Sequence, residues 1–257
     1  MNEMISVTSL AASSRGNAYY LKCGKTELLI DAGISAKCIC DRLKAIGTDI
    51  CRLQGIFVTH EHIDHVKGLA VLSKKCDAPI HMTFPSAEEY LGKYPETKNI
   101  VAHPQNYVTK LDGLTIRSFF SSHDSRACVG YTFETDADKF GIATDTGYVD
   151  KAAVEALTSC RSVVLESNYD GKMLENGGYP PILKDRIRSN TGHLSNYDCA
   201  AFARFLAERG TKNFMLGHLS EENNTPELAY NVTSRALAGF EDIVLKVASR
   251  KEPTFFI

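Results

Sequence analysis

Short apolar runs separated by turn residues fill the first third of the chain and predict β-strands. Residues 5–10, 18–22 and 26–30 have strand length, and Gly24-Lys25 between the last two is typical of a hairpin turn. Apolar residues spaced three and four positions apart predict a helix over residues 36–46 that stops at Gly47. The same criteria predict strands at 55–59 and 79–82 and helices at 67–75 and 85–91.

The alternation of strands and helices continues in the second half. Strands are predicted at 114–120, 130–134, 139–144, 162–165, 212–216 and 243–247, and helices at 151–157, 197–209 and 226–238. The helix at 197–209 has the clearest ends, with Ser195 or Asn196 as its N-cap and Gly210 after it. Two β-rich halves with helices, and no linker between them, predict one α/β (α+β) domain over residues 1–257, a four-layer αββα sandwich.

Composition and charge add limits to this prediction. The net charge of -2 gives no overall basic signature, so any contact with nucleic acid must rest on local charge. The eight cysteines contain no CxxC pair, which favours free thiols in a reducing compartment. No signal peptide is visible at residues 1–4, and no apolar stretch approaches the ~20 residues that span a bilayer. We therefore expect a cytoplasmic protein without a membrane segment.

Metal-binding chemistry is concentrated directly after the strand predicted at 55–59, in His60-Glu61-His62-Ile63-Asp64-His65. Imidazole and carboxylate are ligands of borderline divalent metals such as zinc. Residues two apart in an extended segment point to the same side, so His60 and His62 can bind one metal together. Asp64 and His65, beyond a turn, face a second position, which indicates a two-metal hydrolytic site. A lone histidine is usually a surface or core residue, but three of the chain's eight lie in these six positions.

Four more residues of ligand type follow apolar strands, namely Asp31, His123, Asp145 and His218. Ligands at strand ends have rigid supports and can converge from distant parts of the sequence. Taken singly, Asp31 and Asp145 could be turn residues, since aspartate is common before turns, and His123 and His218 could equally be ligands or ordinary histidines. Their occurrence together, in one order around the histidine-rich segment, favours a shared site.

With this set of residues the chain resembles the metallo-β-lactamase fold superfamily of metallohydrolases over almost its whole length. The run from Thr59 to His65 fits the signature of that superfamily. The resemblance implies one metal held by His60, His62 and His123, and a second held by Asp64, His65 and His218. It also implies that Asp145 bridges the metals, that a bridging water or hydroxide is the nucleophile, and that Asp31 supports the ligands from behind.

Motifs of the second half narrow the resemblance to the bacterial WalJ/YycJ-type branch, which is described as DNA exonucleases. They lie at residues 165–170, 179–180, 191–196 and 217–224. The order of a Glu, a Gly-His pair and a strand-end His is also similar to that in the tRNA 3′-processing endonuclease tRNase Z. This resemblance implies that Glu166 and His193 form a pair that acts on the leaving group. The chain departs from the branch at Tyr169, where His is usual, and at residues 11–16, which are poorer in glycine. Both departures concern substrate contact rather than the expected ligands.

We therefore expect a dinuclear-metal-dependent hydrolase that acts as a phosphodiesterase, specifically as a DNA exonuclease. Asp64 is expected to act as both ligand and proton acceptor, and His193 to protonate the leaving oxygen while Glu166 holds its tautomer. A loop histidine bonded to the backbone is the alternative for His193. The expected metals are two divalent ions, zinc or manganese, with iron as a third candidate.

A hydrolase of small esters, thioesters or lactams on the same fold is the alternative function. A di-iron redox module is disfavoured, because that branch typically has Glu at the position of His62 and carries a flavin domain. The sequence leaves open DNA or RNA as substrate, the polarity, the oligomeric state and the pathway.

Two sets of residues are candidates for contact with substrate phosphates. The basic residues Lys172, Lys184, Arg186 and Arg188 could meet backbone phosphates from a loop over the cleft, or they could form a solvated face. The turn at residues 13–16 is a second, weaker candidate for phosphate contact. His81 and His103 do not fit the ligand pattern and are expected to be structural or surface residues.

Overall fold

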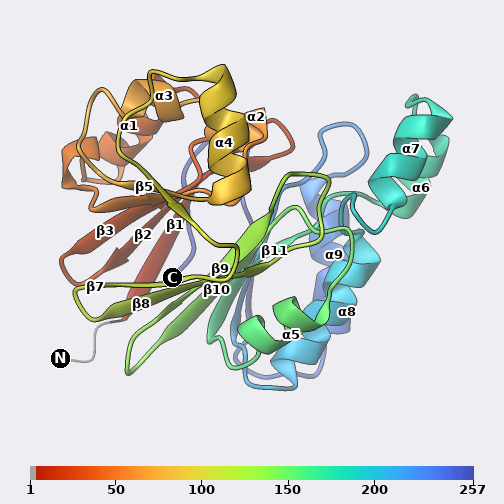
Figure 1. Ribbon diagram of the computed structural model, residues 1–257. Coiled ribbons are helices and arrows are strands. Elements are labelled where there is room, and N and C mark those ends of the chain that lie inside the picture. Colours follow the sequence, from red (N-terminus) through yellow and green to blue (C-terminus); the bar gives the residue numbers. More distant parts are fainter. Residues whose placement is uncertain (1–3) are drawn as a thin grey trace.

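Two seven-stranded sheets lie face to face in the computed structural model, which describes residues 4–257 (Figure 1). Residues 1–3, part of the segment in which we expect no signal peptide, lie outside the described residues. The first sheet has the order β14 (Thr254–Phe255), β1 (Ile5–Ser13), β2 (Gly16–Cys23), β3 (Thr26–Ile30), β4 (Gly55–Phe57), β5 (Ile80–Thr83) and β6 (Ile100–His103). The second has the order β13 (Val244–Val247), β12 (Asn213–Gly217), β11 (Ser162–Glu166), β10 (Lys139–Ala143), β9 (Val129–Glu134), β8 (Leu114–Phe120) and β7 (Val108–Leu111).

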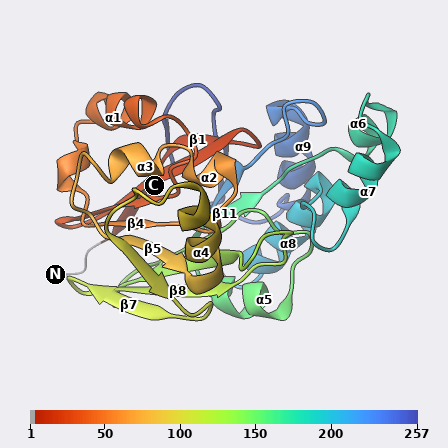
Figure 2. The ribbon, with the colours of Figure 1, turned by 45° about the horizontal axis from the view of Figure 1, so that its top comes forward.

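Helices cover the outer face of each sheet (Figures 1 and 2). The first sheet is covered by α1 (Ala36–Ala45), α3 (Leu69–Leu72) and α4 (Phe84–Lys93), and the second by α5 (Lys151–Leu157), α8 (Asn196–Ala207) and α9 (Pro226–Ala236). The short helices α6 (Gly171–Asn176) and α7 (Pro181–Arg188) project from the body. The remaining short elements are α2 (Ile63–Val66) and a 3-10 turn at Ile50–Arg52.

Three apolar layers hold these elements together. The layer between the sheets contains large side chains that are almost wholly buried, such as Tyr19, Phe57 and Phe133. A second layer packs α1, α3 and α4 on the first sheet, and a third packs α5, α8 and α9 on the second. Burial of each such aromatic side chain contributes about 1.5–3 kcal/mol. The four-layer αββα sandwich predicted from the sequence is thus confirmed.

Strand direction brings the ends of several strands to one edge. Strands β3, β4 and β5 are parallel to one another, as are β10, β11, β12 and β13. Strand β8 runs the same way as β10, because each is antiparallel to β9. Hydrogen bonds that join the sheets at this edge include those from Val129 N to Thr59 O (3.1 Å) and from the Tyr131 hydroxyl to Val58 O (2.7 Å).

Most predicted elements are present, with corrected bounds. The strand at 26–30, the strand at 114–120 and the helix at 151–157 match β3, β8 and α5. The helix predicted at 67–75 is wrong in length, since α3 has only four residues and begins after Gly68, whose backbone packs against Ala32 O and Ile34 O. No helix among residues 4–257 is long and apolar enough to cross a membrane.

Candidate metal centre

The predicted ligands converge at the edge where the parallel strands end. His60 and His62 follow β4, and Asp64 and His65 lie in α2 directly after them. His123, Asp145 and His218 come from the segments that follow β8, β10 and β12. Both sheets therefore contribute side chains, and the seven residues form two groups whose ligand atoms could each hold a metal ion.

The first group consists of His60, His62 and His123, whose ligand nitrogens lie within 4.8 Å of one another. The ring centroid of His60 is 4.5 Å from that of His62 and 5.1 Å from that of His123. Three imidazoles at this spacing are a typical set for zinc or a similar divalent ion.

The second group consists of Asp64, His65, Asp145 and His218. His218 Nε2 lies 3.3 Å from both Asp64 Oδ2 and Asp145 Oδ1, and His65 Nε2 lies 3.1 Å from Asp145 Oδ2. Asp145 Oδ1 is also 3.6 Å from His123 Nε2, so this carboxylate reaches both groups. That is the position that the predicted bridging role requires.

The imidazole tautomers support metal binding, because Nδ1 of several histidines is already occupied. Nδ1 of His65 lies 2.8 Å from Asp31 Oδ2, Nδ1 of His123 donates to Gly192 O (3.0 Å), and Nδ1 of His218 lies 2.8 Å from Glu166 Oε1. These acceptors leave Nε2 of each ring directed at the cluster, as in metal sites whose histidines are oriented from behind. His60 is similar, since its Nδ1 contacts the Thr59 hydroxyl (3.0 Å) and its buried Nε2 has no hydrogen-bond partner among residues 4–257.

Three residues of the site have a left-handed backbone. The φ angles are 59° for Asp31, 55° for Asp145 and 54° for His218, and each residue follows closely on a strand. Residues other than glycine rarely adopt this region, and those that do gather at functional sites. The turn in the backbone directs each side chain back across the strand ends toward the cluster.

Asp31 lies behind the ligands rather than among them. Its buried carboxylate accepts hydrogen bonds from Thr59 N (2.8 Å) and the Thr59 hydroxyl (3.1 Å), besides the contact with His65. Burial raises the pKa of the Asp31 carboxyl, although His65 and Thr59 act in the opposite direction. The supporting role predicted for Asp31 is consistent with this position.

Burial and nearby carboxylates divide the histidines into two kinds. Burial lowers the pKa of His60 and of His123, so both rings are neutral and carry a lone pair. Burial also acts to lower the pKa of His218, but Asp145, Asp64 and Glu166 outweigh it and raise that pKa to about 10. The same balance, with Asp145 and Asp31 dominant, raises the pKa of His65. The carboxylates around these two rings thus favour positive charge at this position, which a divalent cation at Nε2 would supply.

Glu166 and His193 are in contact. The buried Glu166 carboxylate lies with Oε1 2.7 Å from His193 Nδ1, and its Oε2 accepts from Thr146 N (2.8 Å) and Leu194 N (3.2 Å). Burial alone would raise the pKa of Glu166, but His193 and His218 hold it below its usual value. Asp145, Glu166, His193 and His218 are near enough to form a third metal group, yet Glu166 Oε1 already faces two imidazole nitrogens and is not a free ligand.

Glycine is required beside His193. A Cβ atom at Gly192 would lie 2.3 Å from the carbonyl oxygens of Arg186 and Ile187, so the loop packs too closely for any other residue. Gly192 also supplies the carbonyl that orients His123. The predicted Gly-His pair thus connects the first ligand group, through His123, with the Glu166–His193 contact.

Several residues that hold the site together were not predicted. Glu61, inside the histidine-rich segment, accepts from the Ser86 hydroxyl (2.7 Å) and from Arg126 N (2.9 Å), and so ties α4 and the loop after His123 to the centre. Asn17 Nδ2 donates to Ser13 O (3.0 Å) and lies 3.1 Å from His65 Nε2. Asn168 Nδ2 donates to His218 O (2.9 Å). Apart from Ser13, these partners lie 25 or more residues away in sequence, so the local pattern does not reveal the contacts.

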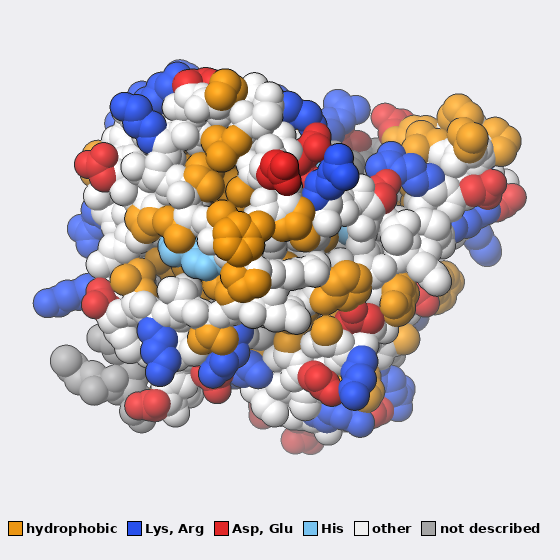
Figure 3. Space-filling model, in the orientation of Figure 1, with side chains coloured by type: hydrophobic (Ala, Val, Ile, Leu, Met, Phe, Trp, Pro, Cys, Tyr) orange, Lys and Arg blue, Asp and Glu red, His pale blue; other side chains and the backbone are white. Residues whose placement is uncertain are grey.

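Three of the four basic residues considered for phosphate contact pair within the chain, whereas Lys172, in α6, has no ion pair among the described residues. Arg186 Nε lies 2.5 Å from Asp124 Oδ2, Lys184 Nζ donates to Glu175 O (2.6 Å), and Arg188 pairs with Glu175. These residues belong to α7, which has no buried residue, so the solvated-face alternative fits better than a loop over the cleft. At the turn of residues 13–16, Arg15 pairs with Glu221 (2.9 Å). Figure 3 shows lysine and arginine interspersed with aspartate and glutamate on the face in view, without a continuous basic patch.

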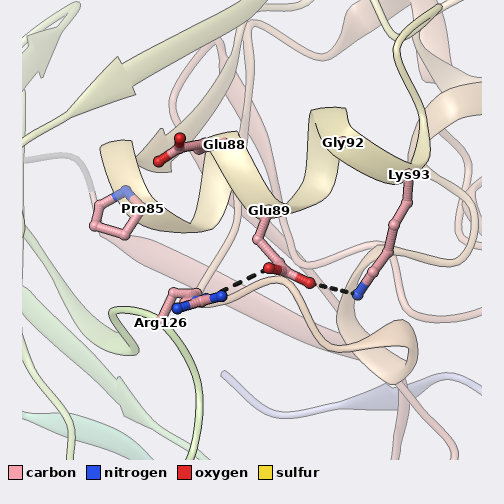
Figure 4. Close-up of a pocket in the computed structure, with 6 residues that line it drawn as sticks. All are labelled: Pro85, Glu88, Glu89, Gly92, Lys93 and Arg126. Carbon is pink, nitrogen blue, oxygen red and sulfur yellow. Dashed lines mark hydrogen bonds and ion pairs between the residues drawn. The ribbon is translucent and has the colours of Figure 1, made fainter.

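A charged depression lies beside the first ligand group. A cavity of about 400 Å³ is lined by His62 and Asp124 and shares Glu89, Lys93 and Arg126 with a neighbouring cavity of about 560 Å³. Figure 4 shows Glu89 between Lys93 (2.8 Å) and Arg126 (3.4 Å) in the larger cavity. The surface next to His62, at one side of the candidate metal centre, is therefore of mixed charge.

Comparison with known proteins adds a family likeness to this geometry. Residues 26–219 match the family model described as the beta-lactamase superfamily domain. The chain is 39% identical over 235 residues to exodeoxyribonuclease WalJ of Streptococcus pneumoniae, and 36% identical over 231 residues to exodeoxyribonuclease YycJ of Bacillus anthracis. Each alignment covers 89% of this chain and 87% of the relative.

A solved structure shares the fold along the whole chain. It is the metallo-β-lactamase fold protein YhfI from Bacillus subtilis, with a TM-score of 0.75 and 15% sequence identity. The match covers 98% of both chains.

Proposed function

This chain belongs to the beta-lactamase superfamily and is a metal-dependent hydrolase, and from that premise we propose that it removes nucleotides from the ends of DNA strands. The observation that carries the proposal is the Glu166–His193 contact (2.7 Å) beside Asp145, at the edge of both ligand groups. Such a pair can protonate a poor leaving group such as a nucleotide oxygen. The relatives named exodeoxyribonuclease, of which the chain covers 87%, support the same reaction.

The imidazole and carboxylate side chains of the two ligand groups fit two divalent cations. His60, His62 and His123 would hold one, and Asp64, His65 and His218 the other, with Asp145 between them. When bound, such cations lower the pKa of water and stabilise charge on a phosphate oxygen. Imidazole and carboxylate ligands suit zinc and manganese, with iron as a third candidate.

His193 is the proposed general acid. Glu166 occupies Nδ1 of the ring, so Nε2 is the atom that can deliver a proton to the leaving oxygen. The His193 side chain is 20% exposed, which allows a substrate to reach it, whereas the Glu166 side chain is wholly buried and acts through the imidazole.

Asp64 is the proposed proton acceptor. Burial alone would raise the pKa of its carboxyl, but His65 and His218 hold that pKa well below the usual range. The side chain is 17% exposed and faces the same space as His218. An ionised carboxylate there can bind a cation and accept a proton in turn.

The test uses end-labelled single-stranded and duplex DNA with metal-stripped protein that is reconstituted separately with manganese and with zinc. We expect stepwise loss of nucleotides from one end with at least one metal, and none with Asp64→Ala, whose bound metal should also fall. Asp136→Ala, an exposed aspartate in the turn between β9 and β10, is the matched control and should retain activity. Equal cleavage by Asp64→Ala, or turnover of esters, thioesters or lactones without any cleavage of DNA, would overturn the proposal.

A further inference from the structure

A second cavity lies on the His193 side of the site, and it differs in chemistry from the charged depression beside His62. It has a volume of about 460 Å³, and its wall includes Tyr148, Leu194, Phe202 and Phe205, with the polar side chains of Arg188, Asn190 and Asp198. We call it the aromatic pocket. A cavity of this size has room for a nucleobase, and aromatic walls with a few polar groups are typical of sites for small planar ligands.

Hydrogen bonds tie the aromatic pocket to the catalytic residues. Leu194, in its wall, and Thr146, which precedes the wall residue Gly147, both donate backbone N–H groups to Oε2 of Glu166 (3.2 and 2.8 Å). Asn190 O accepts from the Ser122 hydroxyl (2.7 Å), next to His123. The pocket and the proposed general acid therefore share one rigid support.

Tyr148 is the ring available for stacking. It is 44% exposed, whereas Phe202 is 6% exposed and the ring of Phe205 is covered by the guanidinium of Arg209 at 3.4 Å. The Asn190 carboxamide has no hydrogen-bond partner within the described chain, so its donor and acceptor are free for a base edge. Aromatic stacking accepts every base, since each has a π face, while an amide can pair with several base edges.

We propose that the aromatic pocket binds a base of the substrate, namely that of the nucleotide whose leaving oxygen His193 protonates. Tyr148 stacks on this base, and Asn190 lies at its edge. This inference rests on the proposed function and adds a substrate subsite to it. The charged depression is a poorer place for a base, because it is lined mainly by Glu, Asp, Lys and Arg side chains and by no aromatic ring other than His62. A base held beside His193 would place its own sugar oxygen near the proton donor.

The experiment compares normal oligodeoxynucleotides with ones that carry a single abasic residue at the terminal or the adjacent position of the degraded end. For the wild-type enzyme we expect kcat/KM to fall about tenfold or more for one of the two abasic positions, in line with the stabilisation that base stacking provides. With Tyr148→Ala the penalty should shrink to less than twofold, because the stacking partner is absent. The readout is the ratio of kcat/KM for the normal oligonucleotide to kcat/KM for the abasic one, taken within each variant. A general loss of activity lowers both values and leaves this ratio unchanged.

Two further variants sharpen the comparison. Tyr148→Phe keeps the ring and should keep the abasic penalty. Tyr230→Ala removes a tyrosine of similar exposure (42%) on α9, outside the pocket, and should also keep it. A wild-type penalty that persists in Tyr148→Ala, or no penalty at either position, would overturn the pocket assignment while leaving the exonuclease proposal intact. No degradation of any oligonucleotide would overturn both.

Discussion

The two carboxylate oxygens of Glu166 contact four nitrogen atoms, two of which belong to His193 and His218. Because only His218 belongs to one of the two principal ligand groups, proton transfer by His193 can be tested separately from metal binding. Oε1 faces Nδ1 of both His193 and His218, while Oε2 is held by two backbone N–H groups. His218 belongs to the second ligand group, but His193 is free of both principal groups. Removal of His193 should therefore change proton transfer without removing a ligand.

We predict that His193→Ala lowers turnover of DNA by roughly 10²–10⁴ with bound metal unchanged, because a positioned general acid contributes about that factor. The loss should be much smaller with bis(p-nitrophenyl) phosphate, whose phenolate leaves without a proton. Steady-state rates on both substrates and the metal content give the answer. An equal loss on both substrates would show that His193 has a structural role instead.

Asp31 gives a second prediction at the scale of single residues. Asp31→Asn keeps the size of the side chain but removes the charge that faces His65 Nδ1. Loss of such a support costs about 10–100-fold in metal affinity, which a competition titration against a chelator measures. Asp112→Asn is the matched control, since Asp112 also has a left-handed backbone (φ 45°) but lies in the β7–β8 turn. Equal affinities in the two variants would contradict the supporting role.

The ligands were predictable from sequence and their supports were not, for a physical reason. His60, His62, Asp64 and His65 lie within one short segment, so their spacing alone indicates a metal site. Asp145 and His218 needed the order of all strand ends to distinguish them from turn residues. Glu61 acts only through contacts made after α4 and the loop at Arg126 have folded against it.

Several secondary-structure elements at the margins of the fold escaped prediction, although the edge strand β13 was predicted. Strands β6 and β7 are the edges of their sheets, and every residue of both is partly or fully exposed, so the apolar signal is weak. Helix α7 has no buried residue and thus no apolar periodicity, and the prolines and glycines before it are typical of a loop. The central strand β3, buried at every position, was predicted with its true bounds, and β4, β11 and β12, also buried throughout, were predicted with bounds one or two residues off.

A stack of rings at the edge of the first sheet leads to a prediction about strands β5 and β6. His81 on β5 stacks on Phe57 (centroids 4.4 Å apart), its Nδ1 lies 2.8 Å from His103 Nε2 on β6, and His103 stacks on Tyr107 (3.9 Å). Burial and the neighbouring His103 lower the pKa of His81 to about 4. These two histidines are structural, as expected from their place outside the ligand pattern.

We predict that this stack loses stability as the pH falls. The unfolded chain takes up a proton on His81 near pH 6.5, and the folded chain only near 4, so protonation favours unfolding throughout that interval. His81→Phe keeps the stacking on Phe57 and has no proton to bind. Its melting temperature should therefore fall less between pH 7 and pH 5 than that of the wild type, as measured by circular dichroism. Parallel pH profiles of the two proteins would contradict this explanation.

At the scale of the whole molecule, we propose that residues 1–257 form a single domain, since one apolar layer joins the two sheets. Phe256, next to β14, belongs to that layer and is 3% exposed, although it lies at the far end of the chain from β1, with which β14 pairs. Its neighbour Phe255 is 63% exposed. These adjacent phenylalanines provide a matched pair of variants.

Phe256→Ala should lower the free energy of unfolding by about 3 kcal/mol, as for other buried phenylalanines, whereas Phe255→Ala should have little effect. Because one domain unfolds in one step, the whole transition should move to lower temperature by several degrees. Calorimetry measures this directly. Two transitions, of which only one moves, would show that the sheets unfold separately.

The left-handed backbone at Asp31, Asp145 and His218 also limits how this enzyme can be improved. Each such residue costs about 1 kcal/mol or more, which glycine would recover. Glycine at any of the three positions would, however, remove a group that binds or orients at the centre. Selection for heat resistance and selection for hydrolysis therefore oppose each other at the same residues, and a thermostable variant must gain its stability in the outer helices or loops.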